Sequence, residues 1–169
     1  MANAIFFKFD GLDGECRESQ HEKWIQVESF SHHLAAMIDR SATSGTGGHS
    51  VGTAEHGDIS FSKVMDSSSM PIYAKCCAGK SFDQVDIELM TSSSGTEATP
   101  NQRILKIVLK KVYIASVSYS DGAGSTGRPM ENIALNYRFI EWTYTPYGDD
   151  GSSLGDITKY WNLETNTGG

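Results

Sequence analysis

The feature that most constrains the fold is a long apolar run, RILKIVLKKVYIASVSY over residues 103–119, with branched side chains on both of its faces. Such side chains fit a pleated sheet, and strand alternation places Ile104 and Val108 on one face and Leu105 on the other. The length of the run indicates one strand with a bend. A small barrel needs an apolar inner face only, so the outer face requires a cover. The run 133–144 has the same property. One helix does not easily cover both runs, and the sequence therefore favours association between copies of the chain.

Shorter runs of strand character, separated by turn residues, fill most of the remaining chain. They lie at 4–9, 23–37, 58–64, 84–91 and 133–145, and the run 23–37 indicates one long strand that crosses from the core to the surface. Residues 69–78 have helical spacing, with Pro71 in the first turn and Gly79 in the C-cap position. We expect residues 1–169 to form one mostly β domain, an antiparallel barrel or sandwich with a single helix.

Residues 41–57, with the sequence SATSGTGGHSVGTAEHG, contain almost no apolar side chains. They are expected to form a long exposed loop, and a loop of this length in a compact domain is uncommon and often functional. Its glycines allow it to bend to fit a partner. Ordering such a loop costs conformational entropy, which new contacts must exceed.

The charge and the cysteines exclude several classes of protein. The chain has 14 Lys and Arg against 21 Asp and Glu, a net charge of −7, and no basic run, which disfavours binding to nucleic acid. No run reaches the roughly 20 apolar residues that cross a bilayer. The N-terminal residues do not resemble a signal peptide, so we expect synthesis and folding in the cytoplasm. The three cysteines, Cys16, Cys76 and Cys77, are expected to be free thiols.

Motifs for catalysis or metal binding are weak. Of the five histidines, His32 and His33 are neighbours in an expected strand and so point to opposite faces, while His49 and His56 are interpreted as solvated loop residues. There is no GxSxG elbow, no phosphate-binding glycine loop and no metal-ligand spacing. A hydrolase that uses His49 or His56 is a weak third hypothesis. The sequence predicts neither an enzyme nor a bound cofactor or metal.

Six stretches in order along the chain resemble the haemolysin-coregulated protein (Hcp) family, the inner-tube subunit of the bacterial type VI secretion system. These are FKFDGLDGEC (7–16), HEKWIQVESFSH (21–32), DISFSKVMDSSSMPIYAKCCAGKSFDQVDIE (58–88), ILKIVLKKVYIASVS (104–118), PMENIALNYRFIEWTYTP (129–146) and GDITKYWNLETNTG (155–168). Each stretch is moderately specific and the ordered set is strong. The chain departs from the family at two places. Cys16 stands where the family commonly has Ser, and His32-His33 stand where it often has Trp-Gly.

The resemblance implies a small two-sheet antiparallel β-barrel with one α-helix, which assembles as a hexameric ring. Rings stack into a tube inside a contractile sheath, a tip protein caps the tube, and small effectors are carried in the lumen. The protein then leaves the cell through this machine without a signal peptide. The resemblance places Ser29, Ser31 and His33 on the strand that lines the lumen. It assigns ring stacking to a loop of Ser44, Gly45, Thr46, Gly47, Gly48, His49, Ser50, Val51 and Gly52.

The main alternative is a monomeric β-sandwich that binds carbohydrate or acts as an adhesin-like module. Such a module would use Trp24, Trp142 or Trp161 as exposed stacking platforms. The two hypotheses predict different particle sizes. A ring has about six times the 18.4 kDa mass of the chain, and the module has the mass of one chain.

Overall fold

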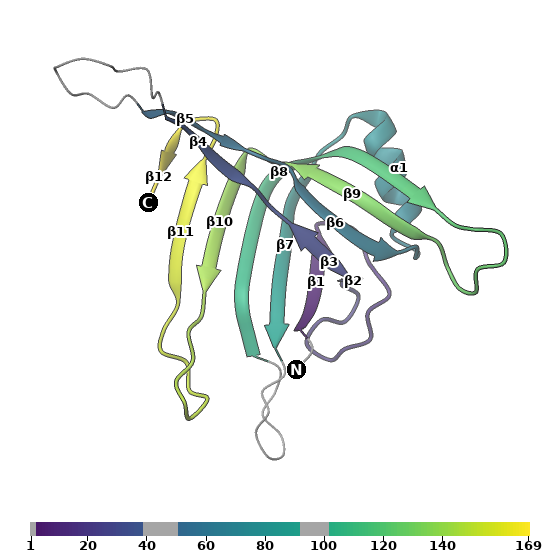
Figure 1. Ribbon diagram of the computed structural model, residues 1–169, viewed down its shortest axis with the longest axis horizontal. Helices are drawn as coiled ribbons and strands as arrows, with labels where there is room; N and C mark the ends of the chain where they lie inside the picture. Colours follow the sequence, from purple (N-terminus) through teal and green to yellow (C-terminus); the bar gives the residue numbers. More distant parts are fainter. Residues whose placement is uncertain (1–2, 39–50, 92–101) are drawn as a thin grey trace.

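The computed structural model describes residues 3–38, 51–91 and 102–169, and this part of the chain contains twelve strands and one helix (Figure 1). The strands are β1 (Asn3–Phe9), β2 (Ile25–Val27), β3 (Ser29–Ser31), β4 (Leu34–Ile38), β5 (Val51–His56), β6 (Ile59–Val64), β7 (Phe82–Thr91), β8 (Gln102–Ser120), β9 (Met130–Asn136), β10 (Phe139–Tyr144), β11 (Ile157–Asn162) and β12 (Thr167–Gly168). The helix is α1 (Ser69–Ala78), as predicted. The described part of the chain is therefore mostly β with one helix.

Two antiparallel sheets share the long strand β8. The first sheet has the order β12-β11-β10-β8-β7-β1-β2, and the second has the order β3-β6-β9-β8. Residues 102–112 of β8 pair with β7, and residues 113–120 pair with β9. Near the end of the first part, Lys111 adopts a left-handed backbone with φ of 52°. The predicted bend in this strand is confirmed, and the bend carries the chain from one sheet into the other.

The barrel is not closed by a continuous ladder of hydrogen bonds. Only Glu28 separates β2, which pairs with β1, from β3, which pairs with β6. The backbone N–H of Glu28 donates to the carbonyl of Ser62 at 2.8 Å, a single contact at the junction. The predicted two-sheet antiparallel architecture is therefore confirmed, and within one copy of the chain the barrel is open.

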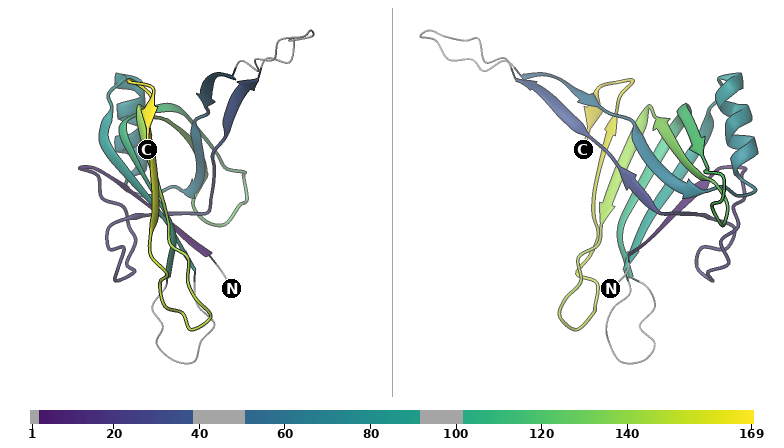
Figure 2. Two further views of the ribbon diagram at one scale, coloured as in Figure 1. Left: turned by 90° about the vertical axis from the view of Figure 1, so that its left-hand side faces the viewer. Right: turned by 45° about the vertical axis from the view of Figure 1, so that its right-hand side comes forward.

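Three predicted segments differ from the structure. The run 23–37 is not one strand, because its alternation changes phase at Glu28 and again before β4, so it forms β2, β3 and β4. The run 133–145 is interrupted at Tyr137 and Arg138 and contributes to β9 and β10. The expected loop 41–57 contains strand β5, which pairs with β4 in a hairpin that projects from the two sheets (Figure 2).

The core lies between the sheets. Its fully buried members come from the inner faces of both sheets and from the helix, and they include Phe7, Ile25, Phe61, Ile72, Leu109, Ile133 and Ile140. Alternation along each strand directs these side chains to the face between the two sheets. The core thus fixes which face of each sheet is left for contacts with other molecules.

The outer face of the first sheet is covered in part by the segment between β1 and β2, where the sequence had indicated only turns. His21 is buried and stacks on Phe6, with the two ring centroids 4.1 Å apart. The two ring nitrogens of His21 lie 2.6 Å from a carboxylate oxygen of Glu18 and 2.9 Å from one of Glu88. By contrast, Tyr160 of β11, which pairs with Glu141 of β10 on the same outer face, is 41% exposed. The predicted need for a cover is therefore met over β1 but not over β11.

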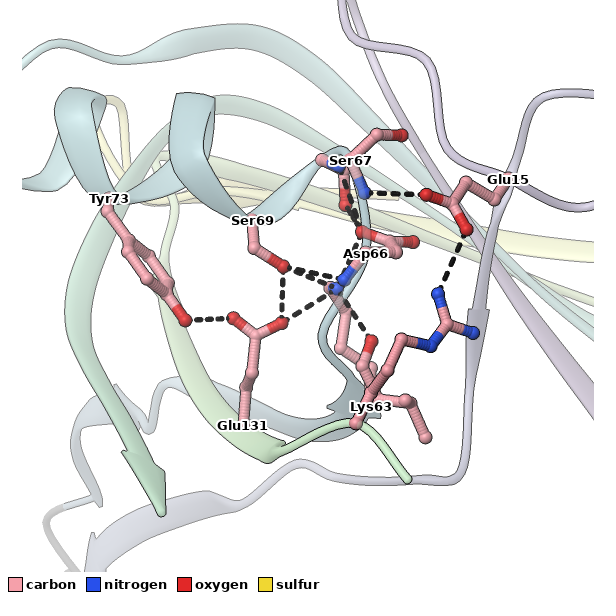
Figure 3. Close-up of polar contacts among 10 residues, drawn as sticks. Glu15, Lys63, Asp66, Ser67, Ser69, Tyr73 and Glu131 are labelled. Atoms are coloured by element: carbon pink, nitrogen blue, oxygen red, sulfur yellow. Dashed lines mark hydrogen bonds and ion pairs between the residues drawn. The ribbon is translucent and has the colours of Figure 1, made fainter. Parts of the chain in front are cut away.

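A buried ion pair joins α1 to the second sheet (Figure 3). Lys63 on β6 and Glu131 on β9 are paired in register and are both 0% exposed, with Nζ 2.8 Å from Oε2. Lys63 also contacts Asp66 Oδ1 at 2.8 Å, while the hydroxyl groups of Ser69 and Tyr73 donate to Glu131. Burial raises the pKa of Tyr73, and the hydrogen bond to Glu131 raises it further. The phenol therefore stays protonated and can donate to Glu131. The first turn of α1 is thus held by the charges of β6 and β9.

Replacing Lys63 with methionine leaves the Glu131 carboxylate buried without its cation. We expect the free energy of unfolding to fall by about 3–5 kcal/mol, the cost of breaking a buried ion pair. The double variant Lys63→Met/Glu131→Gln removes both charges and keeps an amide that can bond Ser69 and Tyr73. It should recover most of the loss. Urea denaturation at fixed protein concentration measures both effects, and a double variant no more stable than the single one would contradict the account.

Candidate functional site

The outer face of the second sheet carries small uncharged side chains. Strand register places Ser29, Ser62, Asn132 and Ser118 in one row across four strands, and Ser31, Ser60, Ala134 and Ser116 in the next. The hydroxyl oxygens of Ser29 and Ser62 lie 2.7 Å apart and form a hydrogen bond across the strands. We call these two rows the serine face.

The opposite face of the same strands is buried and, apart from the ion pair of Lys63 and Glu131, is largely apolar. Phe30, Phe61, Ile133 and Val117 form the intervening row and pack in or against the core. Because side chains alternate between faces, this burial directs the serine face away from the protein. A charged group at either row would meet solvent or another molecule, not the core.

The structure brings together two of the three predicted lumen residues. Ser29 and Ser31 both lie on the exposed serine face, while His33 is exposed but follows β3 in the connection to β4. Sequence reasoning missed Ser60, Ser62, Ser116, Ser118 and Asn132. Serine at every second position in DISFSKV and ASVSYS was the signal that could have found four of them.

The second sheet has two edges without a strand partner in the described part of the chain. Strand β3 pairs with β6 on one side only. Residues 113–120 of β8 pair with β9 on one side only, beyond the point where β7 ends. Unpaired edges present free backbone donors and acceptors and favour pairing with another chain.

The hairpin of β4 and β5 exposes apolar side chains. Leu34 is 48% exposed, Met37 67% and Ile38 56%. The two strands form a sheet of their own, and a two-stranded ribbon is at best marginally stable in water without further contacts. Of the predicted stacking loop, residues 44–50 lie outside the described residues. Val51 and Gly52 are part of β5, so the prediction of a loop is wrong for them.

A tyrosine and two histidines bind the base of this hairpin to the sheets. The hydroxyl oxygen of Tyr137, between β9 and β10, lies 2.7 Å from Nε2 of His32 and 2.9 Å from Nδ1 of His56. Tyr137 is buried, and both imidazoles are partly buried. We call Tyr137, His32 and His56 the hairpin clamp.

Burial also sets the protonation of the clamp. Desolvation lowers the pKa of His32, with further lowering from His56 and His33, and desolvation alone lowers the pKa of His56. Desolvation raises the pKa of Tyr137, and the nearby Asp58 carboxylate adds to the rise. The three groups are therefore neutral together near neutral pH. The interpretation of His56 as a solvated loop residue is wrong, since it ends β5 and bonds Tyr137; His49 lies outside the described residues.

An apolar groove separates the hairpin from β10 and β11. Its volume is about 370 Å³, and it is lined by Leu34, Ala35, Ala36, Ala54, His56, Trp142 and Trp161. Trp142 and Trp161 pack against the core, and Trp24 is partly buried against His21, with ring centroids 4.9 Å apart. None of the three tryptophans is the exposed platform that the binding-module alternative requires.

Two further features bear on function. Within residues 3–38, 51–91 and 102–169, no cluster of three or more His, Cys, Asp or Glu side chains is arranged to hold a metal ion. The helix in the same ranges is too short to cross a membrane.

Comparisons with known proteins give a consistent set of similarities. The family model described as "Type VI secretion system effector, Hcp" matches residues 6–144. Protein hcp1 of Pseudomonas aeruginosa is 29% identical over 167 residues, 98% of each chain. The "Major exported protein" of the same species is 28% identical over 143 residues, 82% of this chain and 79% of that protein. A solved "type six secretion system protein" has a TM-score of 0.89 at 27% identity and covers 99% of this chain and 100% of its own.

Two neighbouring substitutions on β6 test the assignment of faces. Ser60→Gln adds volume on the exposed side and should change the free energy of unfolding by no more than about 0.5 kcal/mol. Phe61→Ala opens a cavity in the core and should cost about 3–5 kcal/mol. Urea denaturation compares the two variants. Equal losses would mean that the serine face is packed inside the protein.

Proposed function

The chain belongs to the Hcp family of type VI secretion tube proteins, and we propose that six copies assemble head to tail into a ring that stacks with others to form the secretion tube. The observation that carries this proposal is the second sheet, with its two open edges and its serine face. Residues 1–169 act as one tube-forming domain. The role is structural, without catalysis or a cofactor.

The open edges suit cyclic assembly. The β3 edge of one copy would pair with the edge of β8 at residues 113–120 in the next, so that the second sheets join around the ring. A head-to-tail contact closes when its rotation completes a circle, and closure removes the unpaired edges that otherwise favour aggregation. The exposed Tyr144 and Ile157 offer further apolar surface for the same neighbour.

Joined second sheets would line the bore with serine faces. Ser29, Ser31 and His33 are then lumen residues, as the resemblance to the family suggested, and Ser60 and Ser62 of β6 extend the same wall. Hydroxyl groups both donate and accept hydrogen bonds, so such a wall contacts the polar surface of a small effector without selecting one sign of charge. The cargo is proposed to be small effector proteins.

The hairpin of β4 and β5 is the proposed stacking arm. It projects from the sheets and carries the exposed side chains of Leu34, Met37 and Ile38, which a neighbouring subunit or ring would cover (Figure 2). The residues between its strands, which include Ser44 to Ser50, would reach the next ring. Contacts of this kind supply the stabilisation that an isolated two-stranded ribbon lacks.

The remaining partners follow from membership of the family. We propose that a contractile sheath surrounds the tube and that a tip protein binds its end. We also propose that the subunit is exported from the cytoplasm through this machine without a signal peptide. The "Major exported protein" carries export in its name, which supports this part of the proposal. The comparisons give no support to the monomeric binding module.

Enlarging a residue of the serine face tests the lumen. Ser31→Gln should reduce the amount of effector that co-purifies with the ring, because the longer side chain displaces cargo from the wall. The control is Ser19→Gln, an exposed serine outside the second sheet. Both variants should elute at the position of the unmodified protein. Normal effector co-purification with Ser31→Gln would count against the lumen assignment.

Shortening the arm tests stacking. Deletion of residues 46–50 leaves β4 and β5 in place and should yield folded rings that no longer form long tubes. Negative-stain electron microscopy shows tube length directly, and circular dichroism checks the fold. Tubes of unchanged length would exclude this segment from the contacts between rings.

A further inference from the structure

The hairpin clamp holds both strands of the hairpin through one atom. One residue separates His32 from the start of β4, and His56 is the last residue of β5. Each strand of the hairpin therefore has one of the two imidazoles at its base. Both imidazoles contact the hydroxyl oxygen of Tyr137, at 2.7 and 2.9 Å. Besides these contacts, the backbone N–H of Gly57 donates to the carbonyl of His33 at 2.9 Å. The direction in which the hairpin leaves the sheets therefore depends on this phenol.

The hydrogen bonds of the clamp tolerate one protonated imidazole but not two. The hydroxyl of Tyr137 has a single hydrogen, so it donates to one imidazole nitrogen and accepts from the other. If one ring is protonated, that ring donates to the hydroxyl oxygen, which then donates to the neutral ring. If both rings are protonated, the hydroxyl has no acceptor in the clamp and two positive charges lie against one oxygen.

The surroundings of the clamp offer limited compensation. Asp58, which follows β5 closely, faces Tyr137 but already accepts from the side chain of Asn136 at 2.9 Å. His33, next to His32 in the chain, lowers the pKa of His32 further and therefore gives no compensation. On the other side, His56 faces the apolar groove that contains Trp142 and Trp161. One carboxylate therefore stands against two or three cations, in partly dehydrated surroundings.

We propose that the hairpin clamp is a pH-sensitive hinge, which fixes the hairpin at neutral pH and releases it when His32 and His56 are both protonated. The hinge rests on the described contacts alone. Its consequence, that tubes come apart into rings in an acidic compartment, rests on the stacking role proposed above for the hairpin.

The direction of the pH dependence follows from proton linkage. Burial lowers the pKa of both histidines, so the clamped state binds fewer protons than a released state in which the imidazoles regain the ordinary value of 6.5. The clamp is therefore fully stable above about pH 6.5 and weakens as the pH falls below that value. Each pKa unit between the two states changes the clamp equilibrium about tenfold.

Hydrogen exchange measures the hinge without reference to stacking. Amide protection of β4 and β5, corrected for the intrinsic rates, is compared at pH 7.5 and pH 5.5 in the assembled protein. We expect protection in the hairpin to fall about tenfold or more at pH 5.5, while β6 and β9 keep theirs. Equal hairpin protection at the two pH values would overturn the proposal.

Variants separate titration from packing. His32→Gln/His56→Gln keeps side chains that bond Tyr137 but do not titrate, so hairpin protection should no longer depend on pH. Glu55→Gln, at an exposed position of β5 outside the clamp, is the control and should retain the pH dependence of the unmodified protein. Tyr137→Phe removes the shared hydroxyl and should lower hairpin protection at both pH values. A double-glutamine variant with unchanged pH dependence would refute the assignment to these histidines.

Electron microscopy at the same two pH values tests whether opening of the hinge affects the stacking of rings into tubes. Loss of tubes at pH 5.5 in the unmodified protein, with tubes retained in the double-glutamine variant, is the expected result. Tubes that persist while the hairpin loses protection would support the hinge and refute its role in stacking.

Discussion

The fold depends on one strand that serves two sheets. Residues 102–112 of β8 run between β7 and β10, and residues 113–120 run beside β9 (Figure 1). Lys111, near the junction of the two parts, has a left-handed backbone conformation. This conformation is uncommon for residues other than glycine, and here the strand pairing on both sides of Lys111 maintains it. This bend separates the second sheet from the first. It thereby creates the open edge of β8 and turns the serine face away from the core.

Polar contacts hold the attachments to this frame. The ion pair of Lys63 and Glu131 holds the helix against the second sheet. The hairpin clamp holds β4 and β5 against Tyr137, between β9 and β10. A buried ion pair gives little net stability compared with apolar packing, but it strongly penalises any arrangement that separates the charges. The apolar core determines the two sheets, and these polar contacts determine the positions of the helix and the hairpin.

Alternation in the sequence was enough to predict β1, β6 and β7, and capping residues were enough to predict α1. Alternation did not predict the structure correctly where pairing with residues far along the chain determines it. The glycines and the threonine in 51–57 are typical of a loop, but pairing with β4 makes residues 51–56 a strand. No sequence pattern predicts that Lys63 and Glu131 are buried, because their burial depends on each other and on Ser69. Ser29 and Ser31 were identified through the family, whereas the rest of their face required the register of four strands.

The central claim is that the open edges of the second sheet close into a six-membered ring. Size-exclusion chromatography with light scattering measures the mass of the assembled particle in solution most directly. The account predicts a mass of about six times 18.4 kDa, and particles with a six-fold ring in negative-stain images. A particle of 18.4 kDa at all protein concentrations would contradict it.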